Sequence, residues 1–169
     1  MATTYTLIQT YTLGSSAASF DFTSIPATYT DLCLKLSART DRAGTGIDSA
    51  LVQFNGDSTS ANYSIRRLYG NGATATSDTT LSGAFTDAST ATASTFGNSE
   101  VYIPNAFGST AKSYSIEGTQ ESNNTTAYVH FTAGKWTGTS AISSIKLVSE
   151  TGSNFVQYSS ASLYGILKA

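Results

Sequence analysis

The strongest constraint on the fold is a strict alternation of apolar and polar residues at positions 31–39. The even positions are apolar, namely Leu32, Leu34, Leu36 and Ala38. Because side chains on a strand point to opposite faces with a period of two, this pattern predicts a strand with one face in a hydrophobic core. Pro26, which lacks a backbone N–H, precedes the strand, so we expect the chain to turn there before it enters the sheet.

The composition favours one β-rich domain over residues 1–169. A chain of this length can bury a sufficient core without disulfides. Ser and Thr make up roughly a third of the residues, while 10 Tyr and 8 Phe supply the large apolar groups. A disordered chain of similar polarity would carry more charge and fewer aromatic residues.

The charge pattern argues against several kinds of partner. Nine Lys and Arg against eleven Asp and Glu give a net charge of -2, and no basic block provides the field that nucleic acid requires. No apolar run reaches the length of a membrane span, and residues 1–4 lack the pattern of a secretory signal. We therefore expect no nucleic-acid or membrane partner, and synthesis in a cytoplasm.

Shorter alternating segments predict the other strands of an antiparallel, jelly-roll-like β-sandwich. They lie at residues 4–13, 18–22, 52–54, 63–69, 100–104, 114–116, 127–133, 145–147 and 155–167. The turn residues Asn55-Gly56-Asp57 predict a hairpin into the strand at 63–69. In the first strand, one face is expected to carry Tyr5, Leu7, Tyr11 and Leu13.

Residues 73–99 are rich in Ala, Ser and Thr and have three large apolar residues, Leu81, Phe85 and Phe96. So long a connection is uncommon in a compact domain and is typical of a functional loop or of an arm ordered by a partner. A mobile insertion is the alternative, because polar low-complexity tracts bury little surface. The three spaced apolar residues favour an arm that docks on a neighbouring subunit.

Catalytic chemistry has little support in the sequence. His130, the single histidine, is expected opposite Val129 and Phe131 on a solvent or interface side, with no sequence signal for an orienting partner. Cys33, the single cysteine, excludes an internal disulfide. The acidic residues show neither a calcium loop nor the carboxylate pair of a glycosidase. We expect a protein that is not an enzyme and holds no metal or cofactor.

Several segments resemble small virion proteins of tailed bacteriophages. They are Ile25-Pro26, Asp31-Leu32, Phe54-Asn55-Gly56-Asp57, Asn62-Tyr63-Ser64, Gly134-Lys135-Trp136, Thr139-Ser140-Ala141-Ile142, Ile145-Lys146-Leu147 and the ending from Asn154 to Ile166 with its Ser162-Leu163-Tyr164-Gly165 run. The resemblance implies a β-sandwich structural protein exposed on the particle, on the capsid surface or in tail fibres, without an active site.

These observations lead to one expected function and one alternative. The expected protein is a capsid decoration or cement protein, made in the host cytoplasm and then part of the virion. It would form a homotrimer that contacts the major capsid protein or another virion protein, because polar second faces rich in Thr and Tyr can be buried between identical copies. The alternative is a tail-fibre or receptor-binding module that holds host glycans with exposed tyrosines.

Overall fold

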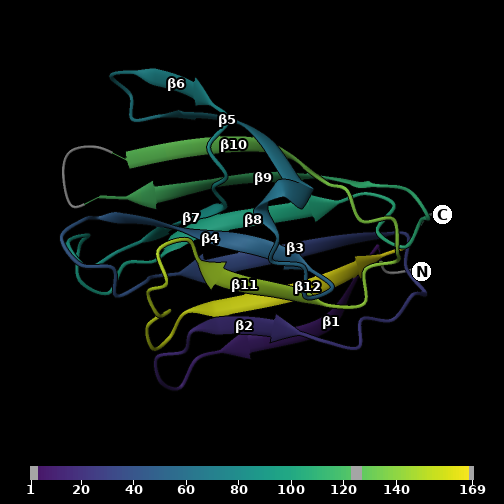
Figure 1. Ribbon diagram of the computed structural model, residues 1–169. Helices are drawn as coiled ribbons and strands as arrows, with labels where there is room; N and C mark the ends of the chain where they lie inside the picture. Colours follow the sequence, from purple (N-terminus) through teal and green to yellow (C-terminus); the bar gives the residue numbers. More distant parts are fainter. Residues whose placement is uncertain (1–3, 123–126, 168–169) are drawn as a thin grey trace.

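Two antiparallel β-sheets pack face to face in the computed structural model, which describes residues 4–122 and 127–167 (Figure 1). Residues 1–3, part of the segment that lacks a signal pattern, lie outside the described residues. The elements in chain order are β1 (Tyr5–Thr12), β2 (Ser19–Phe22), β3 (Asp31–Ala38), β4 (Ile47–Phe54), the 3-10 turn η1 (Ser60–Asn62), β5 (Tyr63–Gly70), β6 (Ala75–Asp78), β7 (Ala84–Asp87), β8 (Gly97–Ile103), β9 (Lys112–Glu121), β10 (Ala127–Trp136), β11 (Ile145–Ser149) and β12 (Ser160–Ile166).

The strand order is that of a jelly roll with an enlarged sheet. The large sheet runs β1-β12-β3-β8-β9-β10-β5-β6, and the small sheet runs β2-β11-β4-β7. The first four strands of the large sheet and the four of the small sheet form the eight-stranded, double Greek-key arrangement. Strands β9, β10, β5 and β6 extend the large sheet beyond the small one (Figure 1). The predicted antiparallel, jelly-roll-like sandwich is confirmed.

The segment whose alternation most constrains the fold is β3, which lies between β12 and β8 in the jelly-roll part of the large sheet. Its predicted apolar face is buried, with Leu34 1% exposed and Leu32 0% exposed. Aromatic residues fill the space between the sheets: the Phe54 ring centroid lies 5.4 Å from that of Tyr114 and 5.5 Å from that of Trp136. An aromatic core of this kind needs no disulfide, since burial of apolar surface stabilises the fold.

The turn after β4 forms as predicted, but it does not close a hairpin. Asn55 and Gly56 have φ of 52° and 73°, and Asp57 N donates to Phe54 O over 2.9 Å. However, β4 belongs to the small sheet and β5 to the large one, so the turn carries the chain from one sheet to the other. The hairpin prediction was wrong because turn residues determine the local backbone conformation but not which strands pair with each other.

Strand β1 contains a bulge that separates residues predicted to share a face. Leu7 pairs with Tyr164 and Gln9 with Leu163, which leaves Ile8 as an extra residue. One extra residue reverses the alternation that follows it. Tyr5 and Leu7 therefore lie on the outer face of the large sheet, while Ile8, Tyr11 and Leu13 pack against the core.

Strand β10 is present where predicted, but its two faces are exchanged. Val129 and Phe131 are 58% and 51% exposed, whereas His130 is 1% exposed and Thr132 is fully buried. Alternation defines two faces without saying which is covered, and here β7 lies across the polar one. Phe85 N donates to His130 Nε2 over 3.4 Å. The prediction that His130 lies on a solvent or interface side was wrong.

Residues 73–99 are not the irregular loop or arm that their composition predicts, since they contain β6 and β7. All four residues of β7 are buried, so no alternation marks this strand. Gly83 allows its close approach to β4, because a Cβ at Gly83 would lie 1.7 Å from Ala50 O. Both faces of β7 are covered by the chain itself, so this part of the segment belongs to the sandwich, whereas β6 is an exposed edge strand of the large sheet.

The connection between β7 and β8 is ordered by one guanidinium group. The two terminal nitrogens of Arg39 donate to the carbonyl oxygens of four residues, Ser89, Ala91, Thr92 and Thr95. The Glu121 carboxylate accepts from Thr92 N over 3.1 Å. Hydrogen bonds from Arg39, which follows β3, and to Glu121 of β9 thus hold this polar connection in place, since it has few apolar contacts.

Candidate functional site

An apolar patch lies on the outer face of the large sheet, the face turned away from the small sheet. It consists of Leu68, Val129 and Phe131, which are 54%, 58% and 51% exposed. Leu68 on β5 pairs directly with Phe131 on β10. A hollow of about 200 Å³ adjoins the three side chains, with Gly70 and Ala75 in its lining. We call Leu68, Val129 and Phe131 the outer patch.

A larger, more polar hollow of about 430 Å³ continues from the outer patch across β9, β8 and β3. Glu117 lies directly opposite Glu100 in the strand register, and Lys35 Nζ lies 2.7 Å from Glu100 Oε2. The hydrogen bond to Glu100 raises the pKa of Lys35. The two carboxylates were missed from the sequence because only the register brings them together. Since Lys35 balances Glu100, the hollow presents one unbalanced carboxylate, that of Glu117.

A second exposed apolar pair lies at the opposite edge of the same outer face. Tyr5 and Leu7 on β1 are 45% and 51% exposed. The Tyr5 ring packs edge-on against Tyr164 of β12, with centroids 6.3 Å apart. Among the described strands, β1 lies at the edge of the large sheet and pairs with β12. We call Tyr5 and Leu7 the edge pair.

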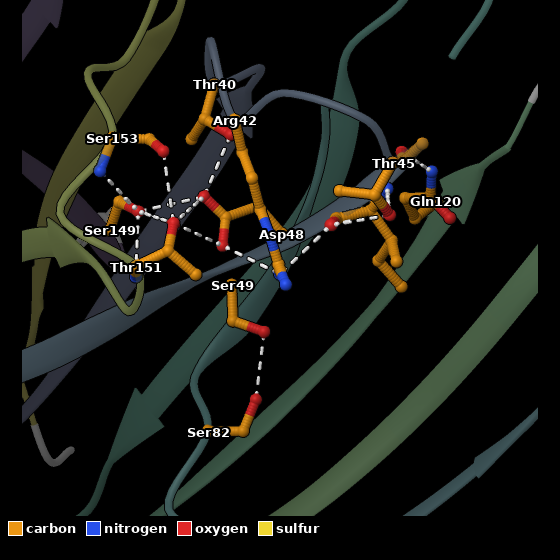
Figure 2. A network of polar contacts seen from close by, with 12 residues as sticks. Thr40, Arg42, Thr45, Asp48, Ser49, Ser82, Gln120, Ser149, Thr151 and Ser153 are labelled. Atoms are coloured by element: carbon orange, nitrogen blue, oxygen red, sulfur yellow. Dashed lines mark hydrogen bonds and ion pairs between the residues drawn. The ribbon is translucent and has the colours of Figure 1, made fainter. Parts of the chain in front are cut away.

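The end of the sandwich where β4 begins is braced by a buried carboxylate. Asp48 is 1% exposed and its Oδ2 accepts from the hydroxyls of Thr40, Ser149 and Thr151 over 2.9, 2.8 and 3.2 Å (Figure 2). Arg42 Nη1 lies 3.5 Å from Asp48 Oδ1. A carboxylate has about four acceptor positions, so these donors occupy it fully. We infer a structural role for Asp48, joining the chain after β3 to the chain after β11.

An open cleft of about 300 Å³ lies above this brace, between the start of β4 and the extension of the large sheet. Its lining comprises Arg42, Ile47, Asp48, Ser49, Arg67, Tyr69, Thr80, Ser82, Phe85, Tyr128 and Glu150. Ser49 and Ser82, whose hydroxyl oxygens are 2.8 Å apart, tie β4 to the chain before β7 (Figure 2). We call this feature the inner cleft, because it lies on the face of β5 and β10 opposite the outer patch.

The structure does not bring Leu81, Phe85 and Phe96 together as a projecting arm. Phe85 is 4% exposed and its ring lies 4.2 Å from that of His130, so it is unavailable to a neighbouring subunit. Leu81 borders a small cavity of about 30 Å³ between the sheets and is partly buried. Phe96 is also partly buried. Partner contacts of Leu81 and Phe96 stay a prediction.

The two residues with catalytic potential are both enclosed. Burial, with a smaller contribution from the Arg67 charge, lowers the pKa of His130 to about 4. Burial also raises the pKa of the Cys33 thiol to about 12, and Glu100 adds to this effect. Near neutral pH, His130 is therefore uncharged and Cys33 is protonated, which makes the thiol a poor nucleophile.

The described residues offer neither a metal-binding cluster nor a membrane-spanning helix. Within residues 4–122 and 127–167, no three His, Cys, Asp or Glu side chains gather in a group able to hold a metal ion. In the same residues, no helix is long and apolar enough to cross a membrane. The chain matches no protein-family model, no curated protein and no solved structure significantly.

Proposed function

We propose that this chain is a non-enzymatic structural protein of a tailed-phage particle, a capsid decoration or cement protein. The observation that carries the proposal is the exchanged faces of β10, which leave Val129 and Phe131 more than half exposed while His130 is buried. Apolar side chains that gather in exposed patches are characteristic of protein contacts. The jelly-roll order of the sheets adds support, because viral capsid domains commonly have it.

The same surface favours a homotrimer. The outer patch and the edge pair lie at separate places on one sheet face, so a contact between the outer patch of one copy and the edge pair of the next is heterologous. Heterologous contacts close into rings when the rotation permits. A ring of three copies would cover Phe131 and Leu7 in every subunit and present three equal binding surfaces to the capsid, which multiplies a weak attachment.

Sedimentation with capsids that lack the protein tests the proposal. The intact chain is expected to pellet with the capsids. A Val129→Ser, Phe131→Ser double variant is expected to stay in the supernatant, because loss of the outer patch would open the ring and leave single copies that attach weakly. Both positions are exposed, so the variant should fold normally. Tyr158→Ser is the matched control, since Tyr158 is 67% exposed and belongs to neither apolar set. Equal pelleting of the double variant, or failure of the intact chain to bind any virion component, would reject the proposal.

The alternative, a fibre module that holds host glycans, has its own structural support in the inner cleft. Tyr69 and Tyr128 contribute to the lining of that cleft. The cleft and the outer patch lie on opposite faces of β5 and β10, so assembly through the outer patch and contact with a glycan do not compete for one surface.

A further inference from the structure

We propose that the inner cleft binds a neutral saccharide. The inference rests on the glycan-binding alternative given above and names its ligand class. It is independent of the capsid proposal, since it uses different residues and the other face of the large sheet. At about 300 Å³, the cleft is at the lower end of the size range of small-molecule sites. Its open form suits one or two residues of a longer chain that extends into solvent.

The aromatic wall of the cleft is suited to contact with the apolar face of a sugar ring. Tyr69 and Phe85 pack edge-on with centroids 6.1 Å apart, which holds Tyr69 at the cleft wall. Tyr128 adds a second phenol, and both tyrosines are half-buried. A tyrosine in such a position offers an apolar ring and a hydroxyl together. The C–H groups on one face of a pyranose and its hydroxyl edge match that combination.

The polar wall contains two guanidinium groups, of which Arg67 is the more enclosed, with a side chain 11% exposed against 41% for Arg42. Arg67 Nη2 lies 2.7 Å from Asp78 Oδ2, and the Arg67 guanidinium lies 4.6 Å above the Tyr69 ring. Arg42 Nη1 donates to Ile47 O over 3.3 Å. Arginine carries five donors in a rigid fork, so each group can keep these contacts and still donate to a ligand oxygen. Side chains already held in place lose little freedom on binding.

The charge balance of the cleft selects a neutral ligand over an anionic one. Arg67 is paired with Asp78, and Arg42 lies beside Asp48. Glu150, which is exposed, adds a further negative charge to the lining. A phosphate, sulfate or sialate would find no excess positive charge here. Sugar hydroxyls both donate and accept hydrogen bonds, so they suit a lining that mixes guanidinium, carboxylate and serine hydroxyl groups.

A glycan array tests the proposal with the full chain displayed on fluorescent beads. The array should hold neutral microbial and animal oligosaccharides beside sialylated, sulfated and phosphorylated ones. At least one neutral structure is expected to bind, and none that depends on an acidic group. For the neutral ligand, Tyr69→Ala should weaken binding about tenfold, the effect of losing a ring contact and its hydroxyl. Tyr158→Ala, which changes an exposed tyrosine outside the cleft, should leave binding unchanged.

A second measurement protects the test against misfolded variants. Titration of the bound oligosaccharide into the isotope-labelled, unmodified protein should shift the amide signals of Ser49, Arg67, Tyr69 and Tyr128. The amide signals of Val129 and Phe131, whose side chains lie on the opposite face of β10, should shift less. Binding of acidic glycans alone, the absence of any bound glycan, or shifts centred on the outer patch would each overturn the proposal. None of these outcomes affects the capsid sedimentation result, so the two proposals can fail separately.

Discussion

The indole Nε1 of Trp136 donates a 2.8 Å hydrogen bond to Oδ2 of Asp57, which joins the end of β10 to the turn after β4. The same carboxylate accepts from Asn62 Nδ2 over 2.9 Å and from Thr59 N over 3.0 Å. These bonds, the one from Trp136 above all, lower the pKa of Asp57 to about 2. One side chain therefore fixes the place where the chain changes sheets.

Replacement of Asp57 should lower stability in a pH-dependent manner. The folded-state pKa of about 2 lies below the ordinary value of 3.8, so the carboxylate stabilises the fold above pH 3.8 and loses this effect as the pH falls toward 2. Thermal unfolding of Asp57→Ala should therefore show a lower midpoint than the wild type at pH 7 and a smaller difference at pH 2. Glu150→Ala, at an exposed site, is the control. Equal midpoints at pH 7 would contradict the prediction.

Paired substitutions in β3 test its register. Leu34 is 1% exposed, so Leu34→Ala should reduce the free energy of unfolding by about 2–5 kcal/mol. The Lys35 side chain is 55% exposed and pairs with Glu100 at the surface, so Lys35→Ala should change it by about 0.5 kcal/mol or less. Denaturant titration measures both. Similar losses in the two variants would mean that the outer face of β3 is also covered in solution.

Alternation in the sequence correctly predicted where strands with one buried and one exposed face lie. Strand β3 alternates strictly, and its apolar face is the buried one. Strand β10 also alternates, but its burial is decided by β7, which lies over His130 and leaves Phe131 outside. No pattern within β10 contains that information, because the covering strand is distant in the sequence.

The candidate sites were harder to predict than the strands. Strand β7 is buried on both faces, so it has no hydrophobic period to detect. The inner cleft collects Arg42, Arg67 and Tyr128 from three separate segments. Their proximity follows from the topology of the extended sheet, while the local sequence around each of them is ordinary. A bulge at Ile8 likewise depends on pairing with β12, and it moved Tyr5 and Leu7 to the outer face.

Acidification should destabilise the protein through His130. Burial and the nearby Arg67 charge hold the folded-state pKa at about 4, against 6.5 in the unfolded chain, so the unfolded state takes up the proton first as the pH falls. Between pH 6.5 and 4 this costs about 3 kcal/mol, at 1.36 kcal/mol per pKa unit. In unfolding titrations across this range, the free energy of unfolding of His130→Gln should fall less than that of the wild type, because the variant has no imidazole to protonate. An unchanged pH slope in that variant would show that His130 does not titrate as described.

Loss of Arg39 should release the connection between β7 and β8. Its guanidinium donates to four backbone carbonyls of residues 89–95, and alanine leaves those groups to water. Hydrogen exchange by mass spectrometry should show faster exchange over residues 88–96 in Arg39→Ala, with little change in β3. Arg66→Ala is the matched control, because Arg66 is exposed on β5 and its Nη1 donates to Ile65 O of the same strand. Protection of residues 88–96 equal to that of the wild type would exclude the role assigned to Arg39.

Light scattering on the purified protein examines the proposed ring directly. The intact chain should have about three times the mass of a 17.6 kDa monomer. Phe131→Ser and Leu7→Ser lie in the two different apolar sets that the ring would join, so each should shift the population toward monomer while the thermal midpoint at low concentration stays unchanged. Tyr158→Ser should remain trimeric.

Mixing the two variants distinguishes a heterologous from an isologous contact. In a heterologous ring, an equimolar mixture keeps one intact interface between an unmodified outer patch and an unmodified edge pair, so it should form dimers. If the contact were isologous, the variant that keeps the self-complementary set intact would already dimerise alone, and mixing would add no dimers. A wild-type mass of one monomer at all concentrations would refute the ring in solution.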